Sequence, residues 1–174
     1  MSPLIQLITP HDWATIAALH AASWKVTYRG ILTDPYLDTR VDADRAAHWE
    51  RRLADQPSNS FGVIAREHDT AVGFAWVDMD DDPVYGNLLD NLHVHPQHKR
   101  GGIGRALMSA VATELIARHA TPSLFLWVYE ENHGARAFYD RIGGTPGDRT
   151  LVTTLDDRRA WQWRYSWPDV AVLR

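Results

Sequence analysis

Cysteine is absent from the 174-residue sequence. Disulfide bonds, thiolate metal sites and a cysteine nucleophile are therefore excluded. Long apolar runs are missing as well, since no stretch approaches the roughly 20 apolar residues that span a membrane. The first residues also lack the basic-then-apolar pattern of a signal peptide. We therefore expect a cytoplasmic protein with no membrane partner.

An excess of positive charge is also missing. The chain has 18 Lys and Arg residues against 22 Asp and Glu residues, for a formal net charge of −4. Nucleic-acid-binding domains carry a broad basic surface, so no nucleic-acid partner is expected and any polyanion must bind at a local cluster. The hydrophobic share of 45% is ordinary for a soluble globular protein. The length predicts a single domain over residues 1–174.

Hydrophobic periodicity predicts alternating helices and strands. Helices are expected at about 10–24, 42–54, 102–118 and 132–142. Strands are expected at 4–8, 61–66, 71–78, 87–94, 124–128, 151–155 and 160–165. Residues 27–38, broken by Gly30 and Pro35, are predicted to form a loop. This order predicts an α/β (α+β) fold with one central mixed, mostly antiparallel sheet of about seven strands and about four helices.

A basic, glycine-rich turn separates the strand that ends at Val94 from the long helix that follows. A helix start carries unpaired N–H groups and a partial positive charge, so it attracts phosphate. Glycine lacks the Cβ atom that would keep a bulky anion at a distance. A P-loop is excluded because Gly104 is followed by Arg105, and a dinucleotide fingerprint is excluded because Leu107 stands where a third glycine is needed. The turn predicts a diphosphate site.

The same turn, Lys99-Arg100-Gly101-Gly102-Ile103-Gly104 after Leu92-His93-Val94-His95-Pro96, resembles the signature of the GCN5-related N-acetyltransferase (GNAT) superfamily, Gln/Arg-x-x-Gly-x-Gly/Ala. Lys99 is a departure from that signature. A second segment with Asn132, Ala135 and Phe138-Tyr139 resembles the family's Asn-x-x-Ala-x-x-Phe-Tyr, although Gly143-Gly144 replaces the usual Gly-Phe. The resemblance covers a cofactor-binding core at about residues 60–145 and implies a single-domain GNAT-like fold.

The resemblance implies an acetyl-CoA-dependent N-acetyltransferase that moves an acetyl group directly to a primary amine of a small molecule or peptide. Acetyl-CoA would be a co-substrate, with no metal. A homodimer is expected only from the resemblance. The alternative is a non-catalytic acyl-CoA-binding sensor or regulatory module. The cofactor-binding residues that the family resemblance implies are Leu92, His93, Val94, Lys99, Arg100, Gly101, Gly102, Ile103, Gly104, Arg105, Asn132, Ala135 and Tyr139.

Two residues are the candidates for acid–base chemistry. By resemblance, Tyr139 would be the general acid for the departing thiolate, since a phenol is a suitable proton donor. Asp90 is the candidate base, and strand alternation predicts that it shares a face with Leu92 and Val94, with His93 pointing away as a structural residue. Asp90 bonding to backbone is the alternative, and Glu130 and Glu131 are lower-ranked bases. No carboxylate is spaced with His93, His95 and His98 as a metal-ligand set.

The acceptor site in the family is formed by the first helices and their loop. Trp24, Tyr28 and Tyr36 are the candidate acceptor-binding residues, and Asp34 and Asp38 lie between them. Aromatic rings with carboxylates suit a cationic amine. An acidic cluster at residues 78–82 could add attraction for a positive substrate. Ordinary packing of the rings and a solvated acidic turn are the alternative explanation.

Overall fold

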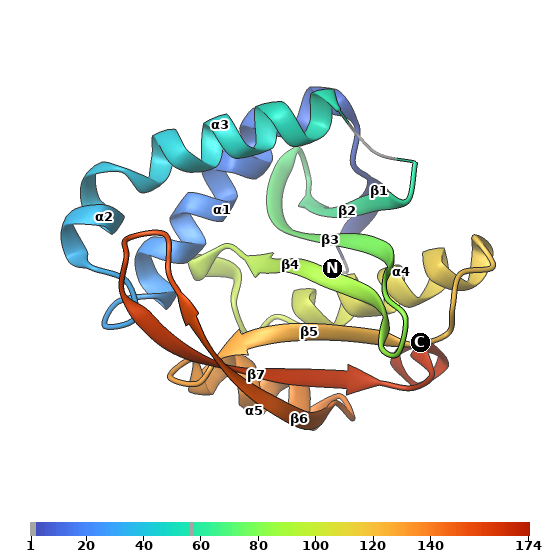
Figure 1. Ribbon diagram of the computed structural model, residues 1–174. Coiled ribbons are helices and arrows are strands. Elements are labelled where there is room, and N and C mark those ends of the chain that lie inside the picture. Colours follow the sequence, from blue (N-terminus) through green and yellow to red (C-terminus); the bar gives the residue numbers. More distant parts are fainter. Residues whose placement is uncertain (1–2, 56–57) are drawn as a thin grey trace.

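The structure, a computed structural model, describes residues 3–55 and 58–174. Its centre is a seven-stranded sheet with the order β1-β2-β3-β4-β5-β7-β6 (Figure 1). The strands are β1 Leu4–Leu7, β2 Ser60–Glu67, β3 Thr70–Asp82, β4 Gly86–Val94, β5 Leu124–Tyr129, β6 Thr145–Thr153 and β7 Arg159–Trp167. Only β4 and β5 pair in parallel, so the predicted mixed, mostly antiparallel sheet is confirmed.

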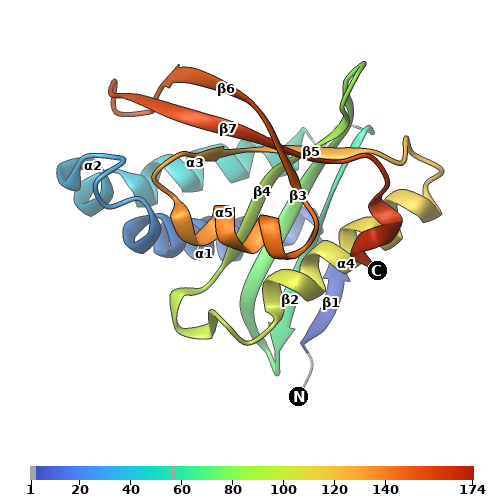
Figure 2. The same cartoon turned by 90° about the horizontal axis from the view of Figure 1, so that it is seen from below.

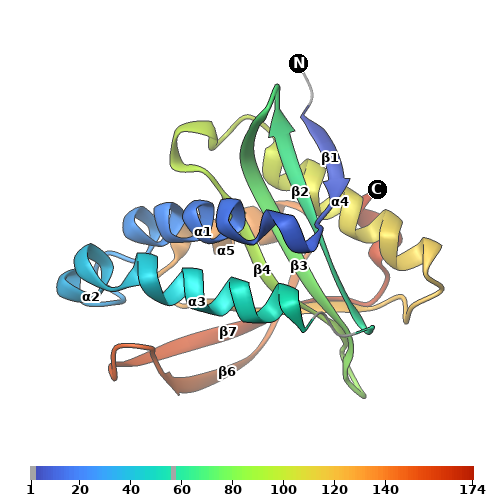
Figure 3. The same ribbon diagram turned by 90° about the horizontal axis from the view of Figure 1, so that it is seen from above.

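Five α-helices lie on the two faces of this sheet. They are α1 Trp13–Thr27, α2 Asp34–Thr39, α3 Val41–Ala54, α4 Ile103–Ala117 and α5 His133–Arg141, with short 3₁₀ turns at Pro10–Asp12, Pro96–His98 and Val170–Leu173. Helices α1 and α3 cover one face and α4 and α5 the other, as Figures 2 and 3 show from opposite sides. No helix in the described ranges is long and apolar enough to cross a membrane.

Two local predictions are wrong, and both concern proline. Helix α2 forms inside the predicted loop, because Pro35 falls in its first turn, where a missing N–H costs nothing. Strand β6 begins at Thr145 rather than at 151. Pro146 is tolerated there because β6 is an edge strand, and a register shift between Pro146 and Arg149 absorbs the irregular segment.

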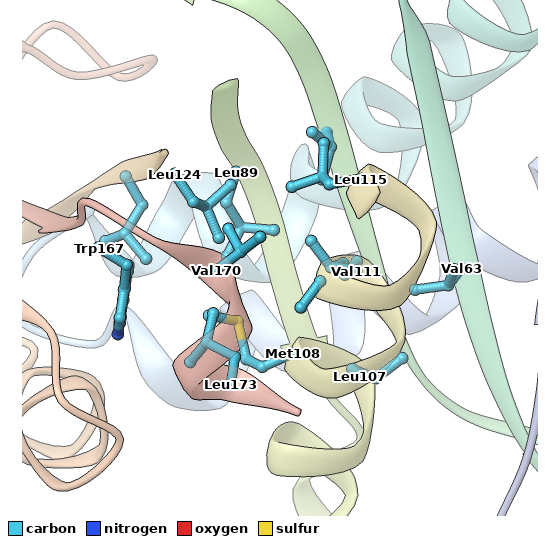
Figure 4. Close-up of a cluster of buried hydrophobic side chains, with 14 of the residues drawn as sticks. Val63, Leu89, Leu107, Met108, Val111, Leu115, Leu124, Trp167, Val170 and Leu173 are labelled. Carbon is cyan, nitrogen blue, oxygen red and sulfur yellow. The ribbon is translucent and has the colours of Figure 1, made fainter. Parts of the chain in front are cut away.

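The larger core lies between the sheet and α4. Leu107, Val111 and Leu115 follow one another at every fourth position, and all three are buried (Figure 4). Each buried side chain of this size contributes about 1.5–3 kcal/mol of hydrophobic free energy. The stripe holds α4 against β2, β3 and β4. This packing holds the first turn of α4 close to the end of β4.

Strands β4 and β5 separate part-way along their length. Their ladder contains only Asn87 opposite Leu124 and Leu88 opposite Phe125. The next residues of β4 contain a bulge against β3, where Asp90 is the extra residue. A bulge bends its strand, and β4 diverges from β5 beyond it (Figure 1). The remaining β5-facing edge of β4 therefore has no partner strand within the described chain.

Candidate functional site

The first turn of α4 presents unpaired backbone donors. The first helical hydrogen bond runs from the Ala106 N–H to the Gly102 carbonyl at 3.0 Å. Among the described residues, no backbone hydrogen bond uses the N–H groups of Ile103, Gly104 or Arg105. Such groups concentrate positive charge at a helix start. The geometry therefore suits an anion at the position where the sequence predicts one.

The glycines of this turn have different roles. Gly102 has φ +81°, a backbone conformation that glycine adopts at little cost, and a Cβ atom there would meet nothing within 4 Å. The open space beside Gly102 leaves room for a ligand. A Cβ atom at Gly104 would lie 3.3 Å from the Phe138 ring. Gly104 therefore allows α4 and α5 to pack closely, a role that the phosphate interpretation missed.

Basic side chains surround the same turn. The Lys99 ammonium donates to the Thr27 hydroxyl at 3.0 Å and so joins the turn to the end of α1. Arg100 and Arg105 are exposed. Arg105 and Arg141 line a cavity of about 250 Å³ between the start of α4 and the end of α5. Positive charge therefore lies on both sides of the unpaired N–H groups.

The side chain of His93 points away from those of Leu92 and Val94, as predicted. Leu92 and Val94 pack against the core beneath α4. His93 Nδ1 lies 3.1 Å from the Ser23 hydroxyl, and its ring centroid is 4.3 Å from that of His20 on α1. Burial lowers the pKa of His93 to about 3, so the ring is neutral. The backbone of this segment remains on the strand edge that faces β5.

Asp90 does not share the face of Leu92 and Val94, which corrects the prediction. The bulge at Asp90 interrupts the alternation of side chains, and the carboxylate turns toward α3. There Arg52 donates to Asp90 at 2.6 Å and to Asp78 at 2.5 Å. Desolvation raises the pKa of Asp90, and Arg52 opposes that shift. The carboxylate, with 34% of its side chain exposed, lies on the same side of the sheet as α1 and α3.

Tyr139 lies on the inner face of α5 and is only 7% exposed. Its ring contacts those of Tyr165 and Trp167, with centroids 5.7 and 5.9 Å away. Among the described residues, no hydrogen bond involves its hydroxyl group. Burial raises the pKa of Tyr139, so the hydroxyl stays protonated at neutral pH. Asn132 caps α5, with its side-chain oxygen accepting from the Ala135 N–H at 3.3 Å.

Tyr139 belongs to a group of phenols near the point where β4 and β5 diverge. The ring of Tyr28, at the end of α1, packs edge-on against that of Tyr129 at 5.3 Å. Burial raises the pKa of Tyr28, and the phenols of Tyr129 and Tyr139 add to the shift. The sequence reasoning missed Tyr129. The sequence feature that could have identified Tyr129 is an aromatic residue at the last position of a buried strand.

The predicted acceptor residues separate into two groups. Trp24 and Tyr28 are partly exposed, and their ring centroids lie 5.2 Å apart. Tyr36 is only 2% exposed and its hydroxyl donates to Asp44 at 2.5 Å. Tyr36 is therefore a packing residue, which corrects its assignment to the acceptor site. Arg45, which the sequence reasoning missed, stacks over the Trp24 ring with its guanidinium carbon 4.5 Å from the centroid.

The acidic residues of this region are largely paired within the protein. Arg29 binds both Asp34 and Asp38. Arg52 binds Asp78, and the Asp82 carboxylate accepts two backbone N–H groups of its own turn. The negative charge predicted to attract a cationic acceptor is therefore compensated in part, because one guanidinium is shared by Asp34 and Asp38 and another binds Asp78.

The other candidate groups have structural contacts. Glu130 accepts hydrogen bonds from Arg149 at 2.5 Å and from the Trp163 indole at 3.2 Å, and the arginine holds the pKa of Glu130 below its usual range. His98 Nδ1 lies 3.1 Å from the Glu67 carboxylate. In the described residues no group of three or more His, Asp or Glu side chains is arranged to hold a metal ion.

Diverging central strands beside a basic helix start define a protein suited to bind a cofactor that carries a diphosphate. Residues 18–144 match the model of the acetyltransferase (GNAT) family, and the chain belongs to this family. It is therefore an acyltransferase of the N-acetyltransferase type, with acetyl-CoA as its co-substrate. The expected family, fold and enzyme class are confirmed.

Individual proteins show the same relationship. An uncharacterized N-acetyltransferase of Bacillus subtilis, YuaI, is 28% identical over 123 residues, which cover 70% of this chain and 68% of the relative. The probable N-acetyltransferase Rv2775 of Mycobacterium tuberculosis is 27% identical over 140 residues, covering 79% and 76%. The PaiA N-acetyltransferase of Thermoplasma acidophilum, solved in complex with coenzyme A, has the same fold, with a TM-score of 0.74, 18% identity and coverage of 96% and 100%.

Proposed function

We propose that this chain transfers the acetyl group of acetyl-CoA directly to a primary amine of a small molecule or peptide. The observation that carries the proposal is the Tyr139 hydroxyl. The Tyr139 side chain is largely buried, but its hydroxyl is not among the buried polar atoms that lack a partner, so the hydroxyl remains accessible. It is protonated, no hydrogen bond of the described residues uses it, and it lies near the divergence of β4 and β5. An accessible phenol without a protein partner can donate to a ligand.

The cofactor would lie along three structural elements. The unpaired N–H groups of residues 103–105 would hold the pyrophosphate, as helix starts commonly do. The free edge of β4 at Leu92, His93 and Val94 would pair with the pantetheine arm as an added strand does. The cavity beside Arg105 and Arg141 would receive a further phosphate of the nucleotide. The cofactor would then extend from the start of α4 toward the tyrosine group.

The residues at the end of that path supply proton transfer. Breaking the thioester C–S bond and forming the amide bond requires a proton for the sulfur and loss of a proton from the ammonium form of the acceptor. Tyr139 would donate to the sulfur. Asp90 would accept from the amine through water, since its carboxylate lies on the side of the sheet that carries α1. The neutral amine would then attack the carbonyl carbon and the C–S bond would break. The second proton that the nitrogen loses on forming the amide would restore the Tyr139 hydroxyl after it has protonated the sulfur.

Incubating the protein with acetyl-CoA and a panel of primary amines, while following free thiol, tests this function. Thiol release that depends on the amine, with the acetylated product found by mass spectrometry, is the expected result. Calorimetry with coenzyme A provides an independent measurement of the cofactor site. No affinity for coenzyme A or acetyl-CoA would overturn the proposal.

The pH dependence of kcat/KM tests the role of Asp90. A base must be ionised, so activity should fall as pH decreases through the pKa of Asp90, which burial raises above that of an ordinary carboxyl group. Asp90→Asn should lower kcat/KM by about 10²-fold, typical of a lost general base, and abolish the acidic limb. Asp78→Asn is the matched control, since Asp78 binds the same Arg52, and it should leave the limb in place. An acidic limb unchanged by Asp90→Asn would remove Asp90 from the mechanism.

A further inference from the structure

Arg45 is a buried cation without a carboxylate partner. It lies in the apolar stripe of α3, between Val41 and Trp49, and is only 8% exposed. Arg164 is equally buried and its Nε likewise lacks a partner, but it forms an ion pair with Asp148. Within the described chain Arg45 forms no ion pair, and its Nε is buried without a hydrogen-bond partner. A buried guanidinium is strongly unfavourable unless an acceptor binds it.

The nearest carboxylates are already engaged. Asp44 accepts the hydroxyl hydrogen of Tyr36 at 2.5 Å, and Asp90 accepts from Arg52 at 2.6 Å. Burial lowers the pKa of Arg45, although Tyr36 and the charges of Asp44 and Asp90 partly oppose that shift. The surrounding protein therefore compensates the charge of Arg45 only in part.

Two further unpaired donors adjoin Arg45. The Trp24 ring lies under its guanidinium, and the indole Nε1 is buried without a partner. The ring of His20 packs edge-on against Trp24 at 4.8 Å. His20 Nδ1 accepts from the Trp49 indole at 2.9 Å, so the neutral ring carries its hydrogen on Nε2, which is also buried without a partner. Within the described chain, this cluster therefore has three buried N–H groups without a hydrogen-bond partner, although Tyr36 contributes a side-chain hydrogen bond to the Arg45 guanidinium.

The cluster adjoins the proposed transfer site. Trp24 is one helical turn before Tyr28 on α1, and their ring centroids are 5.2 Å apart. The next ring along is Tyr129, 5.3 Å from Tyr28. The cluster therefore lies one ring beyond Tyr28, about one helical turn from the proposed position of the acceptor amine.

We propose that Arg45, assisted by the Trp24 indole N–H, binds a carboxylate of the acceptor, so that the acceptors are amino acids or related amino-carboxylates. The inference rests on the proposed function and specifies its substrate class. A guanidinium matches a carboxylate with two parallel charge-assisted hydrogen bonds, a geometry that an ammonium cannot reproduce. His20 supplies a third donor beside Trp24. The amine of such an acceptor would point toward Tyr28 and Asp90.

Matched acceptors test the proposal directly. Amino acids are compared with their own carboxamides and with the amines that lack the carboxyl group, all with acetyl-CoA. We expect kcat/KM to favour the acids by about tenfold to a hundredfold, the range that charge-assisted hydrogen bonds provide. Arg45→Gln should abolish this preference through KM and leave the rates with carboxamides within about twofold. Trp24→Phe keeps a stacked ring but loses the N–H, so it should reduce the preference only in part. Arg51→Gln, an exposed position on the same helix, is the matched control and should change nothing.

The outcomes separate this inference from the proposed function. If wild-type protein fails to bind coenzyme A, the proposed function fails. If the protein acetylates amines but does not prefer the acids, the N–H groups of Arg45, Trp24 and His20 bind only water. That result refutes the carboxylate subsite and leaves the proposed function intact. If Arg45→Gln does not fold, or no amine in the panel reacts, calorimetry on the wild-type protein with coenzyme A compares an N-acetylated amino acid with its carboxamide. Binding of the acid alone supports the subsite, and equal or absent binding overturns it.

Discussion

Replacing Tyr139 with phenylalanine should lower kcat by about 10²-fold or more, the usual contribution of a positioned general acid. The ring packs against Tyr165 and Trp167, so phenylalanine preserves these contacts and removes only the hydroxyl. Affinity for coenzyme A should change far less than kcat, because in the proposed arrangement the pyrophosphate would be held at the start of α4. Steady-state kinetics with a good acceptor measures the first effect, and calorimetry with coenzyme A measures the second.

Tyr165→Phe is the control for this experiment. Tyr165 is also buried, and its ring centroid is 5.7 Å from that of Tyr139, so the two variants perturb the same core. Tyr165→Phe should leave kcat within about threefold of wild type. A Tyr139→Phe enzyme within about twofold of wild type would show that another group protonates the thiolate.

The second large effect is expected at Gly102. A β-branched residue is strained at φ +81°, and its side chain would occupy the open space beside the unpaired N–H groups. Gly102→Val should therefore weaken coenzyme A binding by at least about tenfold, because the side chain would block the pyrophosphate. Calorimetry with coenzyme A on the folded variant gives the number directly.

The backbone strain itself requires a control at a remote position. Gly30 has φ +84°, and a Cβ atom there would also meet nothing within 4 Å, but this glycine lies in the loop between α1 and α2. Gly30→Val should carry similar strain and bind coenzyme A as wild type does. If both variants lose affinity equally, strain rather than obstruction is the cause. If neither does, the phosphate does not lie beside Gly102.

The sequence alone predicted the features that depend on local pattern. The apolar stripe at Leu107, Val111 and Leu115 predicts α4, because residues four apart share a helix face. The glycine-rich turn predicts a helix start open to an anion, since backbone conformation and charge at a helix start depend on neighbouring residues. Two motifs at their proper separation then indicated the family. The loop predicted for residues 27–38 is wrong only from Asp34 onward, where α2 begins, because proline is accepted in the first turn of a helix.

Only the tertiary structure decided which charged groups stay free. The bulge at Asp90 depends on the register between β3 and β4, so alternation within β4 cannot reveal it. Arg29 forms ion pairs with two aspartates that the sequence left available for an acceptor, and their pairing depends on how the α1–α2 loop folds. Arg45 is a charged residue in an apolar stripe of α3, and the sequence shows this pattern. Its lack of a hydrogen-bond partner at Nε is evident only when α1, α3 and β4 are packed together. Long-range contacts set these pairings, and local periodicity carries no information about them.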